Sequence, residues 1–503
     1  MKFTLKHLFV LVAIAALFAL TAAGCGGSTS SASSGQALYQ KANDLYKASQ
    51  YTKAEKLYWK ALPMLAKEGH AAEAHDCRTR AENGQAYMAT YTLTRSDLAK
   101  KLNEAFPNVP QSEKDAWIRS GKLEHMTIDG KTMYYEDVAT NIAYRNVELF
   151  RANTQMLSRY NDLVNVVTGT VIPGATAVPN QPYINPATFG ETATITVPRD
   201  QLPKTGTLKI WLPVPIQNGP QTAVTVISVE PASYLKYPPS TDGDIGDAYL
   251  EVPLDQLSGD LGITLKYRFT RAEERFVVDP AKVGAYDKSD AVYIEYTRSH
   301  GNTAITSPIK KQAQAIVKGE KNPYLAAKKI YYWMLKNVKY SHMPHATLWP
   351  RGIPESVYVH TRRYGDCGAQ SMYFSAMARS LGIPARATGG YQTLLGNYGD
   401  HFWAEFYLPN YGWVPLDTSI GQAPELATVT PEQARAFEDY YFGNMDNLRC
   451  VVQKTTDAIL VPPAADRVLL PLALQSPAGN CDTMQVLPES VLWGGWAMGP
   501  PSQ

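Results

Sequence analysis

The chain has 503 residues, a hydrophobic fraction of 45%, a charged fraction of 19% and a formal net charge of +2. This composition is typical of a globular protein that buries sizeable cores, and the length is enough for about three or four domains. Basic and acidic residues balance, at 48 against 46, and no run of Lys or Arg is dense. We therefore expect no nucleic-acid partner.

Residues 1–24 have the pattern of a secretory signal peptide, with two lysines before an apolar run at 8–20 that is too short to span a membrane comfortably. The following Ala-Ala-Gly-Cys25 is similar to the lipobox of bacterial lipoproteins, which implies that Cys25 is acylated. Ala22 stands where that motif usually has Leu, so plain secretion or an uncleaved anchor remains an alternative. We predict an exported protein, lipid-anchored in the bacterial cell envelope at its periplasmic or outer surface, with residues 25–36 as a lipidated tether.

Residues 37–90 carry apolar side chains at helical spacing. The segment 51–62 is similar to the second helix of a tetratricopeptide repeat, in which small Ala54 and Ala61 let helices approach while Tyr58 fills the groove. One clear repeat is fewer than a free-standing solenoid needs. The stretch is therefore predicted to be a helical hairpin packed on the rest of the protein, with a partner-binding module as the alternative.

Three regions follow in chain order. Residues 91–167 are predicted to be helical, apart from a tight turn of the Asp-Gly type at 129–130. Residues 168–190 are rich in Gly, Pro, Thr and Asn, which is typical of a linker. Residues 191–300 alternate apolar and polar side chains between Pro- and Gly-rich turns, which predicts an antiparallel β-sandwich.

The candidate nucleophile is Cys367. Apolar residues follow it at helical spacing until Gly382, so Cys367 is predicted at the N-terminus of a buried helix. The free N–H groups and the dipole of a helix start favour a thiolate, which is the form that attacks a carbonyl. A cysteine in an apolar segment is more often inert packing, so this feature alone does not establish catalysis.

His401 and Asp417 are the candidate partners of the thiol. They lie at the outer ends of two predicted strands joined by a turn near Pro409. Hairpin symmetry sets His401 opposite Asp417, within a small register shift. A carboxylate there would orient the imidazole, which gives a nucleophile, a base and an orienter in the order Cys, His, Asp. The alternative is an ordinary hairpin with a polar His and Asp at its open end.

Together these motifs resemble the bacterial transglutaminase-like superfamily. The Gly-Asp-Cys helix, the Gly-Ile-Pro-Ala-Arg strand entry, the His-Phe-Trp-Ala-Glu strand and the Gly-Trp-Val-Pro-Leu-Asp strand carry the resemblance, and Cys367, His401 and Asp417 fill the three motif positions. The resemblance covers about a quarter of the chain and implies a papain/transglutaminase-like α+β core at 301–420. Residues 421–503 are expected to be a C-terminal extension that packs on this core. The superfamily includes cross-linking enzymes, proteases, peptide amidases and inactive members, so the reaction stays open.

The remaining cysteines are Cys77, Cys450 and Cys481 if Cys25 carries lipid and Cys367 is the nucleophile. An oxidising compartment favours a bridge between Cys450 and Cys481, which the sequence does not decide.

Two further residues, His342 and His345, could ligate a metal, but their loop has no carboxylate or Cys pattern and a solvated turn is favoured. We expect no cofactor. The backbone N–H of Cys367 is a candidate oxyanion donor, and no second donor is identified.

The predicted fold class is multidomain α+β: an N-terminal helical region, an antiparallel β-sandwich and then the core. The predicted function is that of an extracytoplasmic cysteine acyl-transfer enzyme, a protease, an amidase or a protein-glutamine acyltransferase. It would cleave or cross-link amide bonds of protein or peptide substrates through a Cys367 thioester. Hydrolysis is favoured, because water is always present and no second amine site is visible. The alternative is a catalytically silent envelope scaffold or protein-binding lipoprotein, whose partner would bind the helical N-terminal region.

Overall fold

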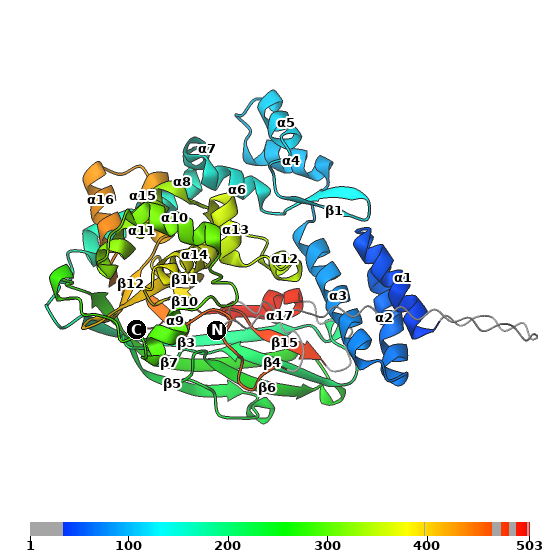
Figure 1. Ribbon diagram of the computed structural model, residues 1–503. Coiled ribbons are helices and arrows are strands. Elements are labelled where there is room, and N and C mark those ends of the chain that lie inside the picture. The colour runs from blue at the N-terminus through cyan, green and yellow to red at the C-terminus, as the bar shows by residue number, and fades with distance from the viewer. Residues whose placement is uncertain (1–33, 397, 465–473, 482–488, 500–501, 503) are drawn as a thin grey trace, which may run out of the picture.

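The computed structural model describes residues 34–396, 398–464, 474–481, 489–499 and 502. Figure 1 shows N-terminal helices along one side, a layer of long strands, and a block of helices and strands packed against that layer. The prediction of an α+β fold with a helical N-terminal region and antiparallel sheets is confirmed. The predicted signal peptide at 1–24, Cys25 and most of the tether lie outside the described residues. Within the described ranges, none of the helices combines the length and the apolar character needed to span a bilayer.

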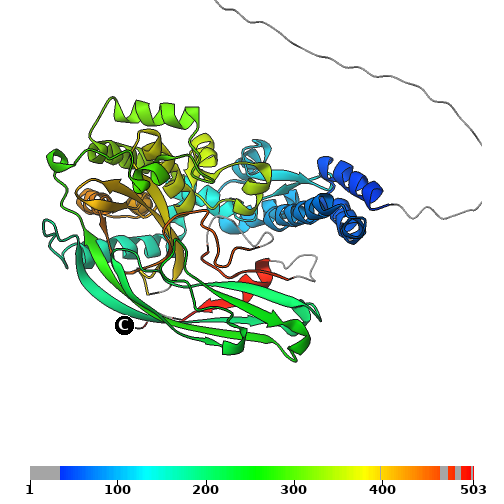
Figure 2. The same cartoon turned by 60° about the horizontal axis from the view of Figure 1, so that its bottom comes forward.

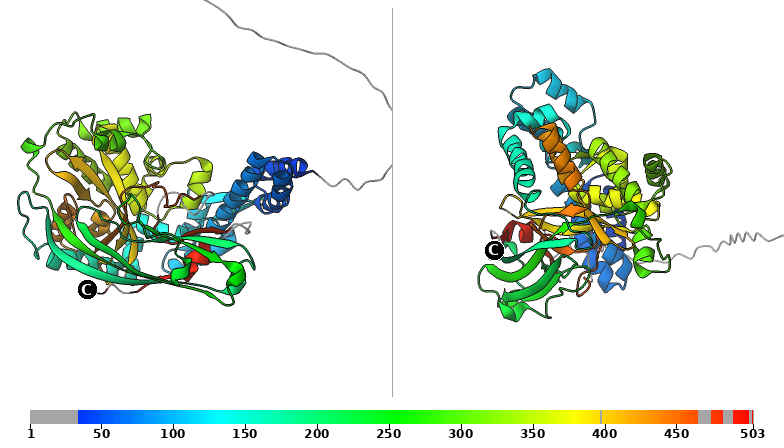
Figure 3. Two further views of the ribbon diagram at one scale, coloured as in Figure 1. Left: turned by 90° about the horizontal axis from the view of Figure 1, so that it is seen from below. Right: turned by 90° about the vertical axis from the view of Figure 1, so that its left-hand side faces the viewer.

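The first three helices pack on one another and project from the rest of the protein (Figure 3). Ala54 and Ala61 are fully buried, and the buried Tyr58 hydroxyl donates a hydrogen bond to Asn43 Oδ1 at 2.7 Å. Small side chains at these two positions leave room for the neighbouring helices. The helices are α1 (Gly35–Lys47), α2 (Tyr51–Lys67) and α3 (Ala71–Thr90).

A second helical group connects these helices to the core. Its short hairpin confirms the predicted Asp-Gly turn, because Ile128 pairs with Lys131 and both Asp129 and Gly130 have positive φ, at 50° and 78°. Asp129 also accepts a hydrogen bond from the backbone N–H of Thr52 in α2 at 3.2 Å, which ties the hairpin to the first group. The elements are α4 (Arg95–Ala105), α5 (Gln111–Arg119), β1 (His125–Ile128), β2 (Lys131–Tyr134), α6 (Val138–Arg145), α7 (Val147–Ala152) and α8 (Thr154–Val166).

Two antiparallel sheets share one hydrophobic core and form the curved strand layer seen in Figure 2. The order is β13-β7-β3-β16 in one sheet, with β5 also paired to β7, and β15-β4-β6 in the other. Ile195 and Leu265 of the first sheet and Ile210 and Leu250 of the second are all buried in this core. The strands are β3 (Tyr183–Val197), β4 (Thr207–Pro213), β5 (Gln221–Glu230), β6 (Asp247–Pro253), β7 (Leu261–Arg275), β13 (Asn444–Met445), β15 (Ala478–Cys481) and β16 (Trp496–Met498).

The core block is built on a four-stranded antiparallel sheet with the order β12-β11-β10-β14. The central helix α14 packs on β10 and β11, and every residue of it from Gly368 to Arg379 is buried. A fully buried helix against a sheet fixes the position of the residue that begins it. The strands are β10 (Ala385–Gln392), β11 (Gly399–Leu408), β12 (Gly412–Leu416) and β14 (Arg449–Gln453), with short β8 (Lys339–Tyr340) parallel to β9 (Tyr364–Gly365).

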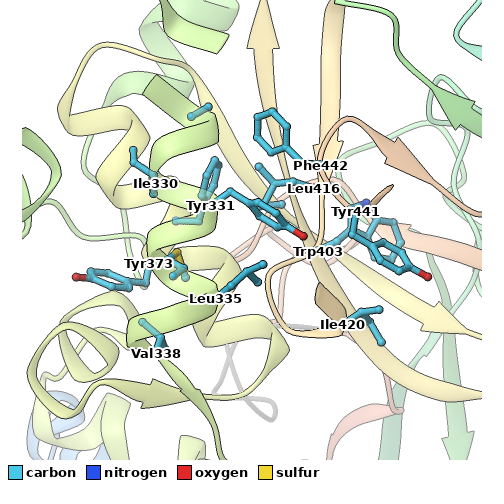
Figure 4. Close-up of a cluster of buried hydrophobic side chains, with 14 of the residues drawn as sticks. Ile330, Tyr331, Leu335, Val338, Tyr373, Trp403, Leu416, Ile420, Tyr441 and Phe442 are labelled. Carbon is cyan, nitrogen blue, oxygen red and sulfur yellow. The ribbon is translucent and has the colours of Figure 1, made fainter. Parts of the chain in front are cut away.

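Helix α11 supplies a second buried face of this block. Figure 4 shows Ile330, Tyr331 and Leu335 of this helix among the side chains of the core sheet and of the segment after it. The rings of Tyr331 and Phe442 lie 5.4 Å apart. The helices of the block are α9 (Ala291–Thr297), α10 (Ser307–Val317), α11 (Pro323–Asn337), α12 (His345–Leu348), α13 (Glu355–Arg362), α14 (Cys367–Ser380), α15 (Ala423–Leu426) and α16 (Pro431–Tyr440).

The C-terminal segment contributes a strand to each of the three larger sheets: β14 to the core sheet, β13 and β16 to the sheet of β3 and β7, and β15 to the sheet of β4 and β6. The segment also holds α17 (Glu489–Gly495). Cys450 lies in β14 and Cys481 in β15, and the structure joins them by no disulfide. Both side chains are buried in the core shared by the two sheets.

Candidate active site

The structure places Cys367 as the first residue of α14. Asp366 caps this helix, because its Oδ1 accepts a hydrogen bond from the backbone N–H of Ala369 at 3.0 Å. The Cys367 side chain is partly exposed and packs against a small cluster formed by Met372, Ala387 and Phe402. The nucleophile candidate therefore sits between a helix start and the strand that carries His401.

The surroundings of the thiol act on its protonation in opposite directions. Burial raises the pKa of Cys367, and the carboxylate of Asp366 adds to this rise, while the backbone N–H groups of Phe402 and Gly368 lower it. Together these effects place the pKa of Cys367 well above its usual range. The N–H groups of the helix start favour the thiolate, as expected, but burial and the neighbouring carboxylate outweigh them in the free protein. The thiol holds its proton until a base removes it.

His401 and Asp417 meet, although the hairpin register differs from the predicted one. Ala404 pairs with Leu416, so the next residue pair along the hairpin is Trp403 and Asp417, two residues away from the expected register. His401 nevertheless reaches across, and its Nε2 lies 2.7 Å from Asp417 Oδ2. The two side chains are buried, with 5% and 0% exposure. Because Nε2 is engaged by Asp417, Nδ1 is the ring nitrogen that remains for the thiol.

Asp417 has further partners that the sequence did not indicate. Its Oδ2 also accepts a hydrogen bond from Arg449 Nη1 at 2.8 Å, and its Oδ1 accepts one from the backbone N–H of Ile420 at 2.9 Å. Burial alone would raise the pKa of Asp417, but His401 and Arg449 outweigh it and hold that pKa well below the usual range. Asp417 is therefore ionised at neutral pH.

His345 is not in a solvated turn, which corrects the prediction for this loop. Its Nδ1 lies 2.8 Å from Glu355 Oε1, and its Nε2 bonds Asp366, the residue before the nucleophile. Burial opposes a charged ring, but the two carboxylates outweigh it and raise the pKa of His345 well above its usual range. His345 thus lies between two carboxylates that favour its protonated form. No group of His, Cys, Asp and Glu in the described ranges is arranged to hold a metal.

The second helical group packs against the segment that lies beside the thiol. Asn141 of α6 exchanges two hydrogen bonds with the backbone of His342, at 3.0 and 2.7 Å, and the ring of Tyr144 lies 4.8 Å from that of Tyr340. Burial raises the pKa of Tyr340, and the Cys367 thiol adds to the rise, so this hydroxyl lies in the surroundings of the thiol. Tyr340 also pairs with Gly365, two residues before Cys367.

Comparison with known families agrees with this architecture. Residues 310–418 match the model of the transglutaminase-like superfamily, a segment that includes Cys367, His401 and Asp417. The chain carries a transglutaminase-like domain. This confirms the family resemblance seen in the sequence, and the matched segment runs from α10 to the end of the β11–β12 hairpin. Arg449 lies beyond the matched segment.

Two curated proteins are similar over parts of their length. An uncharacterized protein of Haemophilus influenzae is 27% identical over 177 residues, which is 30% of this chain and 47% of that protein. A protein-glutamine gamma-glutamyltransferase of Pseudomonas aeruginosa is 29% identical over 122 residues, which is 21% of this chain and 18% of that protein. The chain thus spans less than half the length of either relative.

Two solved structures align with larger parts of the chain. A candidate cysteine protease from Cytophaga hutchinsonii has 14% sequence identity and a TM-score of 0.37, covering 63% of this chain and 89% of its own. The periplasmic domain of TgpA from Pseudomonas aeruginosa has 16% identity and a TM-score of 0.23, covering 49% of this chain and 98% of its own.

Proposed function

We propose that the protein is an exported cysteine acyl-transfer enzyme that hydrolyses amide bonds of protein or peptide substrates through a Cys367 thioester. One observation carries the proposal: the thiol at the start of α14 lies beside a strand whose buried His401 is held by an ionised Asp417. A nucleophile, a base and a group that orients the base are the parts that this chemistry needs.

The first half-reaction follows from the ring nitrogen that Asp417 leaves unused. His401 Nδ1 takes the proton of the Cys367 thiol as the sulfur attacks the carbonyl carbon of the amide, and Asp417 stabilises the imidazolium. The C–N bond then breaks, the imidazolium gives its proton to the leaving amine, and a thioester remains on Cys367. Since the thiol of the free protein is neutral, proton transfer accompanies the attack rather than preceding it.

The second half-reaction uses the same base. A water molecule gives a proton to His401 while its oxygen attacks the thioester carbon, and the sulfur leaves with that proton, which restores the thiol. The oxyanion formed in each half faces the start of α14, where the backbone N–H of Cys367 is a candidate donor. A primary amine in place of water would give cross-linking by the same steps.

Export and anchoring rest on the sequence of the first residues. The basic start, the short apolar run and Ala-Ala-Gly-Cys25 support a signal peptide followed by acylation of Cys25. Growth in the presence of a labelled fatty acid tests this, since we expect label in the wild-type protein and none in Cys25→Ala. Label in both proteins would contradict anchoring at Cys25.

Activity is best tested on a peptide library made by digesting a whole proteome. Peptides are incubated with the purified protein and analysed by mass spectrometry for cleavage and for deamidated glutamine, and a fluorescent primary amine is added in a parallel sample. With the wild-type protein we expect cleaved or deamidated peptides and little amine incorporation. With Cys367→Ala we expect the peptides to stay unchanged. A library left unchanged by the wild type, or changed equally by Cys367→Ala, would overturn the proposal in favour of the scaffold.

A further inference from the structure

The carboxylate that orients His401 is shared with a second cation. Asp417 Oδ2 accepts one hydrogen bond from His401 Nε2 at 2.7 Å and another from Arg449 Nη1 at 2.8 Å. Asp417 and Arg449 have fully buried side chains. A charge-assisted hydrogen bond between buried groups is stronger and better oriented than one in water. Arg449 therefore fixes the same oxygen atom that His401 uses.

Arg449 is itself held on its other side. Its Nη2 and Nε lie 3.1 and 3.2 Å from Asp446 Oδ2, while Asp446 Oδ1 accepts the backbone N–H of Leu448 at 3.1 Å. The guanidinium carbon lies 5.3 Å from the ring centre of Trp403, which is stacked on His401. The arginine thus has no freedom to swing away from Asp417.

The position of Arg449 depends on a strand outside the matched family segment. Arg449 begins β14, which pairs with β10 at the edge of the core sheet. The close approach of the two strands requires Gly390, because a Cβ atom there would lie 1.9 Å from the carbonyl oxygen of Cys450. The C-terminal segment therefore adds a charged side chain to a site whose other members lie within residues 310–418.

Basic side chains and carboxylates alternate along this buried row. His401 is followed by Asp417, then Arg449, then Asp446. The positive charge of Arg449 offsets part of the negative charge of Asp417 as His401 experiences it. Without this offset, the buried carboxylate would favour the protonated imidazole more strongly, and a protonated imidazole cannot accept the proton of the thiol.

We propose that Arg449 is a positioning residue for the Cys367–His401 pair: it fixes Asp417 and offsets its charge, so that His401 can gain and lose a proton. This inference rests on the proposed function, in which His401 takes the thiol proton. Its two effects are separable, because Lys at position 449 keeps the charge but not the forked hydrogen bonds.

Other titratable groups surround the row and come from several elements. None of them is changed in the variants below, so a shift in the titration of His401 reports on the row. They are Cys367 of α14, Asp400 of β11, Tyr331 of α11, Tyr441 after α16, and Arg271 and Glu274 of β7.

The test is an NMR titration of His401 in protein labelled with ¹³C at the histidine Cε1 position. The signal of His401 among the 9 histidines is the one missing from His401→Gln. We expect Arg449→Met to move the titration midpoint of His401 to higher pH by about one unit or more, and Arg449→Lys to recover most of that shift. Asp446→Asn should move the midpoint to lower pH, because the charge of Arg449 then acts on Asp417 without competition.

The opposite shifts of the His401 midpoint in Arg449→Met and Asp446→Asn distinguish a positioning role from a merely structural one. A structural residue would lower the melting temperature in these variants without moving the midpoint, so a folded Arg449→Met with the wild-type midpoint overturns the inference. If Arg449→Met does not fold, Asp446→Asn decides: an acid shift supports the inference, and an unchanged or alkaline midpoint overturns it. The titration needs no substrate, so a failure of the peptide-library test with these shifts intact would count against the proposed function alone.

Discussion

Two histidines flank the nucleophile helix, and each bonds a buried carboxylate, yet the third group differs. His401 shares Asp417 with the cation Arg449, whereas His345 lies between two anions, Asp366 and Glu355. With a carboxylate beside each ring nitrogen, His345 favours its protonated form. A histidine beside a carboxylate thus serves as a structural ion pair at His345 and as a candidate proton carrier at His401. The difference lies in the charge of the third group, a second carboxylate at His345 and an arginine at His401.

His345 also affects the nucleophile, through Asp366. Asp366 precedes Cys367 and raises the pKa of its thiol, and His345 offsets part of that negative charge. Burial opposes the charge of Asp366, but His345 outweighs it and lowers the pKa of this carboxyl, so Asp366 remains the charged cap of α14. One histidine therefore supports the helix that carries the thiol, while the other serves the thiol itself.

The largest effect is expected from removing the carboxylate that orients His401. Asp417→Asn removes the charge that stabilises the imidazolium and leaves Arg449 without its partner. We expect the alkylation rate of Cys367 at pH 7 to fall by a factor of about 100 or more, measured by intact mass after timed exposure to iodoacetamide. Asp400→Asn is the control, because this exposed carboxylate lies beside His401 but outside the row. A loss of less than about fivefold in both variants would contradict the role of Asp417.

Breaking the ion pairs of His345 should act mainly on stability. His345→Gln leaves Asp366 and Glu355 facing each other, and we expect the free energy of unfolding in urea to fall by about 2–3 kcal/mol at pH 6. The folded-state pKa of His345 lies above its unfolded value, so its contribution is complete below about pH 6.5 and is lost as the pH rises through the folded value. The difference from the wild type should therefore shrink at alkaline pH. His75→Gln on the exposed face of α3 should show no such pH-dependent difference.

A smaller change would make the two histidines more alike. Glu355→Gln leaves His345 with one carboxylate, and we expect the pKa of His345 to fall, because one of the two charges that raise it is gone. The histidine ¹³C signals report this value directly, and Glu113→Gln, a change at an exposed residue of α5, is the control. An unchanged pKa would mean that Asp366 alone fixes the charge of His345.

The sequence predicted the parts of the site that depend on local pattern. The helix after Cys367 and the strand of His401 follow from the spacing of apolar residues, and the family motifs agree with them. The hairpin register was missed by two residues because the turn is centred on Asn410 instead of Pro409, with positive φ at Asn410 and Gly412, 74° and 85°. A turn of three residues has no unique signature in this stretch.

Partners that come from distant segments could not be predicted. His345 is 21 residues from Asp366, and Arg449 is 32 residues from Asp417. Neither distance has a periodicity that would bring the side chains together, and both arise from the packing of separate elements on α14 and β10. The Asp in Gly-Asp-Cys did carry a signal, since an Asp before a helix start is a common N-cap.

The central claim is that His401 removes the proton of Cys367, and the pH dependence of Cys367 alkylation tests it most directly. In the wild type we expect alkylation at neutral pH, because His401 accepts the proton as the sulfur reacts. In His401→Ala the reaction must wait for the free thiolate, and burial raises the pKa of the thiol, so alkylation should be at least about 100-fold slower at pH 7 and should rise only at alkaline pH. Identical pH profiles for the two proteins would contradict the account.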